Sequence, residues 1–161
     1  MSEAADVLHL LRERGATVAT AESLTGGQLA AALTSVPGAS AAYVGGVVSY
    51  ATRVKIDVLG VPRELVETHG VISPECALAM ARGVARLTDA SHALATTGVA
   101  GPDRQEGRPP GTVHVAVLGP DGHELLALHL PGDRAAVQSA TCRAALSALG
   151  GILGREEGAL G

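Results

Sequence analysis

The chain of 161 residues contains no tryptophan, no phenylalanine and only two tyrosines. Apolar residues nevertheless make up 47% of the sequence, which is far above the content of a disordered chain. A hydrophobic core must therefore be built from alanine, valine, leucine and isoleucine. The length suits one domain, which we expect to span residues 1–161 with a core from about residue 5 to residue 153.

Cysteines and long apolar runs are scarce as well. Cys76 and Cys142 are the only cysteines and lie far apart in sequence, so neither a disulfide framework nor a zinc site is indicated. We expect both to be buried as small apolar side chains. No apolar run approaches the ~18 residues of a membrane span, and the N-terminus lacks the layout of a signal peptide. We therefore expect a cytoplasmic protein that has no membrane partner.

The charge and the histidines exclude further classes. The net charge of -4 argues against a nucleic-acid partner, because such proteins neutralise phosphates with an excess of lysine and arginine. None of the six histidines pairs with another at a metal-ligand spacing such as H-x-x-x-H. None lies in a context typical of a catalytic triad, so we expect structural or surface roles for them. The sequence predicts no metal site and no cofactor.

Helix and strand signals alternate along the chain. Helices are expected at residues 2–14, 26–35, 52–59, from 73 onward after Ser73-Pro74-Glu75, and 134–153. Strands are expected at residues 16–21, 43–49, 91–97, 112–118 and 123–130, the last two joined by a hairpin turn. This order predicts an α/β fold, a three-layer α/β/α single domain with a mixed, mostly parallel sheet and a C-terminal β-hairpin followed by a helix. Residues 103–111 are expected to form a surface loop, and the tail from Arg155 to Gly161 is expected to fray.

Two glycine-rich segments follow predicted strands, where ligands of such sheets bind. They are Ser23 to Gly27 and Gly98 to Pro102. The first places a serine and a threonine in front of a glycine pair at the start of a helix. The backbone amides of Thr25 to Gly27 are suited to bind a phosphate or to stabilise an oxyanion beside a hydroxyl nucleophile. If the protein is an enzyme, its chemistry is expected to begin at Ser23.

A serine nucleophile needs a base, and Lys55 is the only lysine in the chain. Arginine stays protonated at working pH, whereas a desolvated lysine can lose its proton. The alternative is an ordinary solvated lysine on a helix face. Tyr50 either reaches into the site or lies at the rim of the core. Glu22 either orients its neighbours or pairs with an arginine.

Common hydrolase and phosphate-binding motifs do not fit this segment. The Walker A pattern G-x-x-x-x-G-K-S/T is absent. No glycine precedes Ser23 by two positions, so the G-x-S-x-G elbow is absent, and Gly26 occupies the lysine position of S-x-x-K. Taken alone, Ser-x-Thr-Gly-Gly has low specificity.

Six motifs in one order are far more specific. They are Glu22-Ser23-Leu24-Thr25-Gly26-Gly27, Tyr50 with Lys55, Gly70-Val71-Ile72-Ser73, Gly98-Val99-Ala100-Gly101-Pro102, Pro110-Gly111-Thr112 and Gly132-Asp133-Arg134. Over roughly residues 5–153 the chain therefore resembles the CinA C-terminal domain family, the nicotinamide-nucleotide amidases. It resembles the stand-alone form of the family, without the second, nucleotide-related domain to which some members are fused.

The resemblance implies hydrolysis of the carboxamide of nicotinamide mononucleotide, giving nicotinate mononucleotide and ammonia in pyridine nucleotide recycling. It implies a catalytic dyad of Ser23 and Lys55. The substrate-binding residues that it implies are Thr25, Gly26, Gly27, Tyr50, Gly98, Ala100, Gly101 and Arg134. The expected partner is a small-molecule nucleotide substrate, and the chain is expected to form a homo-oligomer.

Three positions depart from the family pattern. Thr52 stands where asparagine is common, Leu130-Pro131 replaces a common aromatic residue, and Gln138 stands where a second arginine is often found. The departures leave the dyad intact and bear on fine substrate contacts.

The implied mechanism starts with neutral Lys55 taking the proton of Ser23, which attacks the carboxamide carbon. Arg134 and the loop from Gly98 to Gly101 are candidates for holding the phosphate. The loop from Asp103 to Pro110 is a candidate lid. Two alternatives stay open: a serine amidase for another small carboxamide, and a non-catalytic mononucleotide-binding module in which Ser23 and Thr25 hold phosphate.

Overall fold

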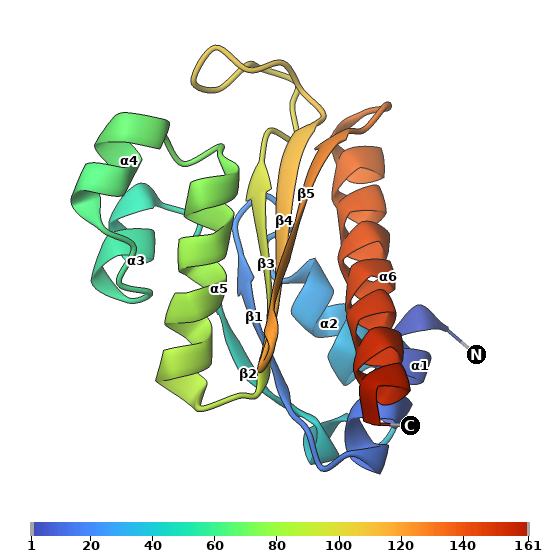
Figure 1. Cartoon of the computed structure of the whole chain (residues 1–161). Helices are drawn as coiled ribbons and strands as arrows, with labels where there is room; N and C mark the ends of the chain where they lie inside the picture. The colour runs from blue at the N-terminus through green and yellow to red at the C-terminus, as the bar shows by residue number, and fades with distance from the viewer. Residues whose placement is uncertain (1, 161) are drawn as a thin grey trace.

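A five-stranded sheet in the order β2-β1-β3-β4-β5 runs through the computed structural model, which describes residues 2–160 (Figure 1). The strands are β1 (Val18–Glu22), β2 (Tyr43–Val48), β3 (His92–Gly98), β4 (Thr112–Gly119) and β5 (Gly122–His129). Strand β1 pairs in parallel with β2 and β3, whereas β4 pairs antiparallel with β3 and β5 antiparallel with β4. Four of the five strands therefore point the same way, and the predicted mixed sheet with its C-terminal hairpin is confirmed.

Helices cover both faces of this sheet (Figure 1). One layer contains α1 (Glu3–Glu13), α2 (Gln28–Thr34) and α6 (Arg134–Leu160). The other contains α5 (Pro74–Thr88), with α3 (Thr52–Asp57) and α4 (Arg63–His69) on the same side, and a short 3-10 helix, η1 (Ala39–Ala41), precedes β2. The predicted three-layer α/β/α architecture is confirmed, and α4 is an element that the sequence did not predict.

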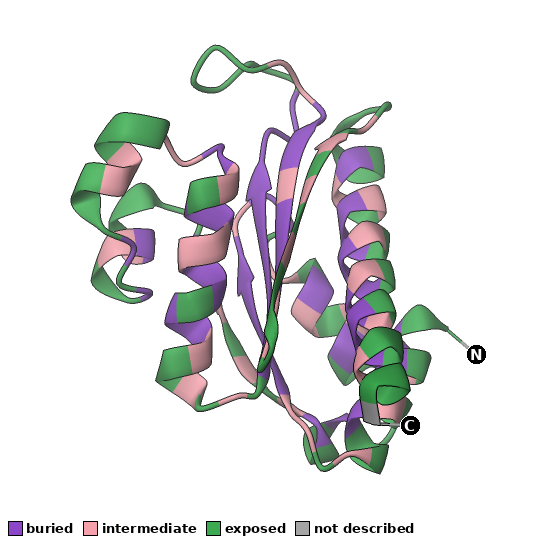
Figure 2. Cartoon of the chain, in the orientation of Figure 1, coloured by how far each residue is buried: buried purple, intermediate pink, exposed green. Residues whose placement is uncertain are grey.

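The two faces of the sheet are built from side chains of different size. Toward α1, α2 and α6 the sheet presents valines and leucines, whereas toward α5 it presents the alanines Ala19, Ala21, Ala93, Ala95 and Ala116. Small side chains allow α5 to pack closely against the sheet, so the core needs no aromatic residue. On another side of α5, Gly83 lets the segment after α3 approach closely, because a Cβ there would lie 1.9 Å from the Leu59 carbonyl oxygen. The sheet interior is accordingly buried along most of its length (Figure 2).

The predicted start of α5 is confirmed in atomic detail. Ser73 is the N-cap, and its hydroxyl accepts a hydrogen bond of 3.1 Å from the Cys76 amide, while Pro74 takes the first helical position. Cys76 and Cys142 are both buried and free, as expected. Within residues 2–160 no helix is long and apolar enough to cross a membrane.

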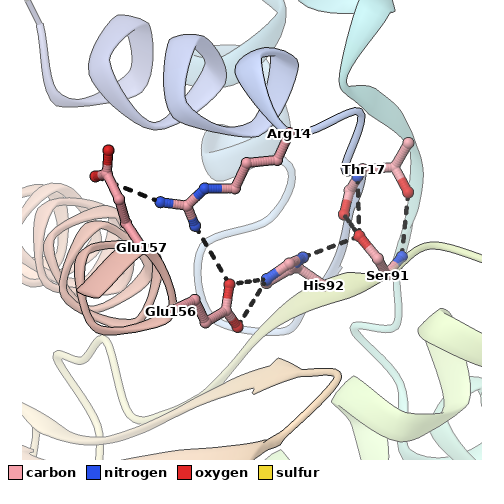
Figure 3. Close-up of polar contacts among 6 residues, drawn as sticks. All are labelled: Arg14, Thr17, Ser91, His92, Glu156 and Glu157. Atoms are coloured by element: carbon pink, nitrogen blue, oxygen red, sulfur yellow. Dashed lines mark hydrogen bonds and ion pairs between the residues drawn. The ribbon is translucent and has the colours of Figure 1, made fainter. Parts of the chain in front are cut away.

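The predicted fraying of the C-terminal tail is wrong for the described residues, and Gly161 lies outside them. α6 continues to Leu160 because Glu156 is held by one partner on β3 and one just after α1 (Figure 3). Its carboxylate lies 3.0 Å from His92 Nε2 on β3 and 3.4 Å from Arg14 Nη1 beyond α1. These contacts join α1, β3 and α6 at the end of the sheet where β3 begins.

Ser91 and His92 extend this cluster, since Ser91 Oγ lies 2.9 Å from His92 Nδ1 (Figure 3). The order serine, histidine, glutamate is that of a hydrolytic triad. However, Ser91 Oγ accepts the Thr17 amide at 2.9 Å and lies 3.0 Å from the Thr17 carbonyl oxygen. The hydroxyl is therefore engaged with backbone on both sides, and we interpret the cluster as a structural clamp.

Candidate functional site

Ser23 lies directly after β1, at the carboxyl end of the parallel strands. Side chains alternate along β1, so Ala19 and Ala21 face α5 while Glu22 faces α2. Ser23 continues this alternation and points to the α3 and α5 side. Its amide donates to the Thr96 carbonyl at 3.0 Å, and its own carbonyl accepts from the Gly26 amide at 3.0 Å, which closes a tight turn. The predicted nucleophile therefore lies in a fixed turn at the expected edge of the sheet.

Lys55, on α3, reaches this turn from the same side. Its side chain is buried, with 1% of the residue exposed, so the alternative of a solvated lysine is wrong. The Nζ atom lies 2.9 Å from Ser23 Oγ, 2.6 Å from the Ser49 carbonyl oxygen and 3.4 Å from the Tyr50 carbonyl oxygen. Among the residues that the structure describes, no carboxylate forms an ion pair with it. Lys55 is thus a buried amine held by one hydroxyl and two carbonyls.

The surroundings of Lys55 favour its neutral form. Burial lowers the pKa of the Lys55 ammonium below its ordinary value, and this effect outweighs the attraction of Cys76 and Glu106. Burial also raises the pKa of the neighbouring Cys76 thiol to about 11, so at neutral pH the thiol is uncharged and its attraction on the ammonium is absent. A neutral amine can donate to the carbonyls of Ser49 and Tyr50 and turn its lone pair toward the Ser23 hydroxyl. This is the arrangement that a general base requires.

A cleft of about 370 Å³ opens above Ser23. It is lined by Ser23, Leu24, Tyr50, Gly98, Ala100, Gly101, Pro102, Asp103, Gln105 and Arg134. Arg134, the only cation of this lining, donates to the Gly101 carbonyl at 2.7 Å and to the Tyr50 hydroxyl at 2.9 Å. Tyr50 is 59% exposed and therefore belongs to the cleft wall rather than to the rim of the core. The structure brings six of the predicted site residues to one cavity and places Lys55 directly behind it.

Three of the predicted substrate-binding residues do not line the cleft. The Thr25 hydroxyl is fully buried and lies 2.8 Å from the Thr96 hydroxyl, because Thr25 faces the α2 and α6 layer. The Gly26 amide donates a hydrogen bond to the Ser23 carbonyl. Gly27 adopts φ +100 as the N-cap of α2 and packs beside Val48. These residues shape the turn, and the Thr25 hydroxyl and the Gly26 amide are already engaged within the protein.

The N-terminus of α2 is already occupied by a carboxylate of the chain. Glu22 accepts hydrogen bonds from the amides of Leu29 at 2.8 Å and Ala30 at 3.0 Å. It therefore caps the helix, and the alternative in which it pairs with an arginine is wrong. A substrate phosphate has no place there. The amides of Leu24, Thr25 and Gly27 have no acceptor among residues 2–160, so they are the donors of this turn that are available for an oxyanion.

The loop after β3 is anchored beside the cleft. Glu106 accepts hydrogen bonds from the amides of Val71 at 3.0 Å and Ile72 at 2.9 Å. Gly70 makes this approach possible, because a Cβ there would lie 2.7 Å from the Glu106 carboxylate. The Gly70-Val71-Ile72-Ser73 motif thus receives the loop that carries Asp103 and Gln105 into the cleft lining.

The sequence interpretation missed Leu24, Asp103 and Gln105 as individual lining residues, and it treated Gln138 only as a departure. Gln138 donates to the Leu24 carbonyl at 2.9 Å. Its spacing of four residues from Arg134 on one helix is a signal that places both side chains on one face. Thr52 and Pro131, the other departures, are exposed and lie outside the cleft lining.

Comparison with known proteins gives one consistent family. Residues 1–153 match the CinA C-terminal domain. A CinA-like protein of Frankia casuarinae is 53% identical over 133 residues, which are 83% of this chain and 31% of the relative. A CinA-like protein of Parasynechococcus marenigrum is 46% identical over 152 residues, which are 92% of this chain and 36% of the relative. The chain spans about a third of the length of these curated relatives.

Solved structures agree with the sequence matches. A competence-damaged protein (CinA) superfamily protein from Klebsiella pneumoniae superimposes with a TM-score of 0.92 at 37% identity, covering 95% of this chain and 96% of that one. A competence/damage inducible protein from Agrobacterium tumefaciens gives a TM-score of 0.88 at 37% identity, covering 91% of each chain.

Proposed function

The chain belongs to the CinA C-terminal domain family, and from this membership and the contact between Ser23 and Lys55 we propose that it is a nicotinamide-nucleotide amidase. The reaction is hydrolysis of the carboxamide of nicotinamide mononucleotide to nicotinate mononucleotide and ammonia. One observation carries the proposal: Lys55 Nζ lies 2.9 Å from Ser23 Oγ, buried and without a carboxylate partner among the described residues. Burial lowers the pKa of Lys55 and so favours the neutral amine, which is the form that a general base requires.

In the proposed first step, neutral Lys55 takes the Ser23 proton while Oγ attacks the carboxamide carbon. The carbonyl oxygen becomes an oxyanion, which the free amides of the nucleophile turn stabilise. Loss of one such donor costs about 2.7–4 kcal/mol of transition-state stabilisation in comparable sites. Protonated Lys55 then gives its proton to the departing nitrogen, and ammonia leaves a nicotinoyl ester on Ser23. Water cleaves this ester by the reverse proton route and restores both side chains.

The cleft also suits the charged groups of this substrate. Arg134 is the only cation of the lining and has guanidinium donors left after its bonds to Gly101 and Tyr50. We assign it to the substrate phosphate. Asp103 provides a carboxylate in the same lining, which complements the pyridinium charge of the nucleotide. Gly98, Ala100 and Gly101 belong to the same lining.

The non-catalytic alternative has less support than the amidase. In that alternative Ser23 and Thr25 hold phosphate, but the Thr25 hydroxyl pairs with Thr96 and only Ser23 lines the cleft. An amidase for another carboxamide would use the same dyad. A comparison of substrates therefore distinguishes that alternative from the proposed function.

The experiment is a substrate panel scored by ammonia release. Nicotinamide mononucleotide, nicotinamide riboside, nicotinamide, asparagine and glutamine are compared at equal concentration. The proposal expects kcat/KM for the mononucleotide to exceed that for the riboside, because the riboside lacks the phosphate partner of Arg134. Equal values for the two would contradict the assigned substrate, and binding of the mononucleotide without ammonia release would support the non-catalytic module.

A further inference from the structure

Gln138 ties α6 to the nucleophile turn. It lies one helical turn after Arg134, and its Nε2 atom donates to the Leu24 carbonyl oxygen at 2.9 Å. Arg134 therefore faces the cleft while Gln138, four residues further on, holds the backbone one residue after Ser23. The nucleophile turn receives no other side-chain hydrogen bond to a backbone carbonyl among the described residues.

This hydrogen bond fixes the orientation of a whole peptide group. The peptide bond between Leu24 and Thr25 is trans, since the only cis bond in residues 2–160 joins Gly101 and Pro102. In a trans peptide the carbonyl and the following N–H point in opposite directions. Because Gln138 holds the Leu24 carbonyl toward α6, the Thr25 N–H points away from α6.

The Thr25 N–H points to the side of the turn on which the proposed reaction takes place. α6 covers one face of the sheet, and α3, which carries Lys55, lies on the side of the other face (Figure 1). Ser23 Oγ points to Lys55, so the Thr25 N–H and the nucleophile are turned to the same side of the turn. The Thr25 amide has no acceptor in the described structure, although the residue is fully buried. An unpaired amide in this position is a costly feature unless a ligand or intermediate accepts from it.

We propose that Gln138 is a positioning residue, which holds the Leu24–Thr25 peptide so that the Thr25 N–H donates to the oxyanion formed when Ser23 attacks. The inference rests on the proposed function, because it needs Ser23 as the nucleophile. Gln138 touches neither substrate nor the reacting atoms, and it acts through the peptide group. Its hydrogen bond also polarises the carbonyl and thereby strengthens the N–H as a donor.

The test compares variants that keep or remove a donor at this position. Gln138→Met keeps the length and loses the donor, Gln138→Glu keeps the shape and puts oxygens against the carbonyl, and Gln138→Arg keeps a donor. Ser139→Ala, at the next and exposed position of α6, is the matched control. Each protein is assayed with nicotinamide mononucleotide and with 4-nitrophenyl nicotinate. The ester reports acylation of Ser23 even if the natural amide is a different one, and its leaving group needs no proton from Lys55.

We expect Gln138→Met and Gln138→Glu to lower kcat about 10- to 100-fold with both substrates, at a KM within about twofold of wild type. Gln138→Arg and Ser139→Ala are expected to stay within about threefold of the wild-type kcat. A merely structural role would not be rescued by arginine and would not separate kcat from KM. Wild-type kcat in Gln138→Met, or in a folded Gln138→Glu, overturns the inference alone. If the wild type cleaves the ester but not the mononucleotide, the proposed substrate is overturned and the ester assay still tests Gln138. If the wild type cleaves neither compound, both proposals are overturned.

Discussion

Lys55 Nζ lies 2.6 Å from the Ser49 carbonyl oxygen, which is the shortest contact of this buried amine. The carbonyl orients the amine but carries no negative charge to retain its proton. Burial consequently lowers the pKa of Lys55, and the proton can leave at a pH where ordinary lysines keep theirs.

The pH dependence of the proposed reaction follows from this. Since the base must be neutral, kcat/KM is expected to rise with pH and to level off below the ordinary lysine pKa of about 10.4. Lys55→Arg cannot lose its proton, so its rate is expected to be about 10²- to 10⁴-fold lower at every pH and to lack this limb. The measurement is a pH–rate profile of ammonia release. A wild-type profile in Lys55→Arg would remove Lys55 as the base.

The lowered pKa of Lys55 also makes the stability of the folded protein depend on pH. Because the folded pKa of Lys55 is lowered, the unfolded chain binds more protons between that value and about 10.4. We define the difference as the free energy of unfolding of the wild type minus that of Lys55→Met. This difference is expected to rise as pH increases through this window. Urea denaturation of both proteins at several pH values measures the difference, in which other titrating groups largely cancel. A difference that falls with pH would mean that folding favours the charged lysine.

Glu106 is expected to matter for substrate binding rather than for the chemical step. Glu106→Ala removes the acceptor of the Val71 and Ile72 amides, each bond being worth about 0.5–1.5 kcal/mol. The loop that brings Asp103 and Gln105 to the cleft loses its anchor, so KM is expected to rise about tenfold with a nearly unchanged kcat. Steady-state kinetics measures both, with Glu67→Ala on exposed α4 as the control. A fall in kcat at constant KM would place Glu106 in the chemistry instead.

The clamp at the other end of the sheet is expected to affect stability only. Glu156→Ala leaves the buried His92 without its carboxylate and is expected to lower the free energy of unfolding by about 1–3 kcal/mol. Glu157→Ala, which removes only a 3.6 Å ion pair at an exposed side chain, should change it by less than about 0.5 kcal/mol. Urea denaturation compares the two variants. Equal stabilities would show that the tail is held by apolar packing alone, and a loss of activity in Glu156→Ala would contradict a purely structural clamp.

Local signals account for what the sequence predicted well. The Ser73 cap and the hairpin turn after β4 depend on a few neighbouring residues, and the structure confirms both. α4 gives only a weak signal, since none of its residues is fully buried and its only apolar residues are the adjacent pair Leu65 and Val66. The tail was mispredicted because its partners Arg14 and His92 lie 142 and 64 positions away from Glu156.

In the site, too, local motifs were predictable from the sequence, whereas features that depend on long-range contacts were not. The motif order identified Ser23 and Lys55, but the burial of Lys55 depends on contacts between segments 32 residues apart. The roles of Thr25 and Glu22 were open because strand alternation decides which face each side chain takes, and a shift of one residue exchanges the faces. A homo-oligomeric state and a cytoplasmic location stay predictions of the sequence.

If Ser23 and Lys55 act as one catalytic unit, ammonia release from nicotinamide mononucleotide needs both side chains. Wild type, Ser23→Ala and Lys55→Ala are compared under the same conditions, after circular dichroism has confirmed that each is folded. The account predicts turnover by the wild type and rates near background for both variants. Normal turnover by either variant would contradict it.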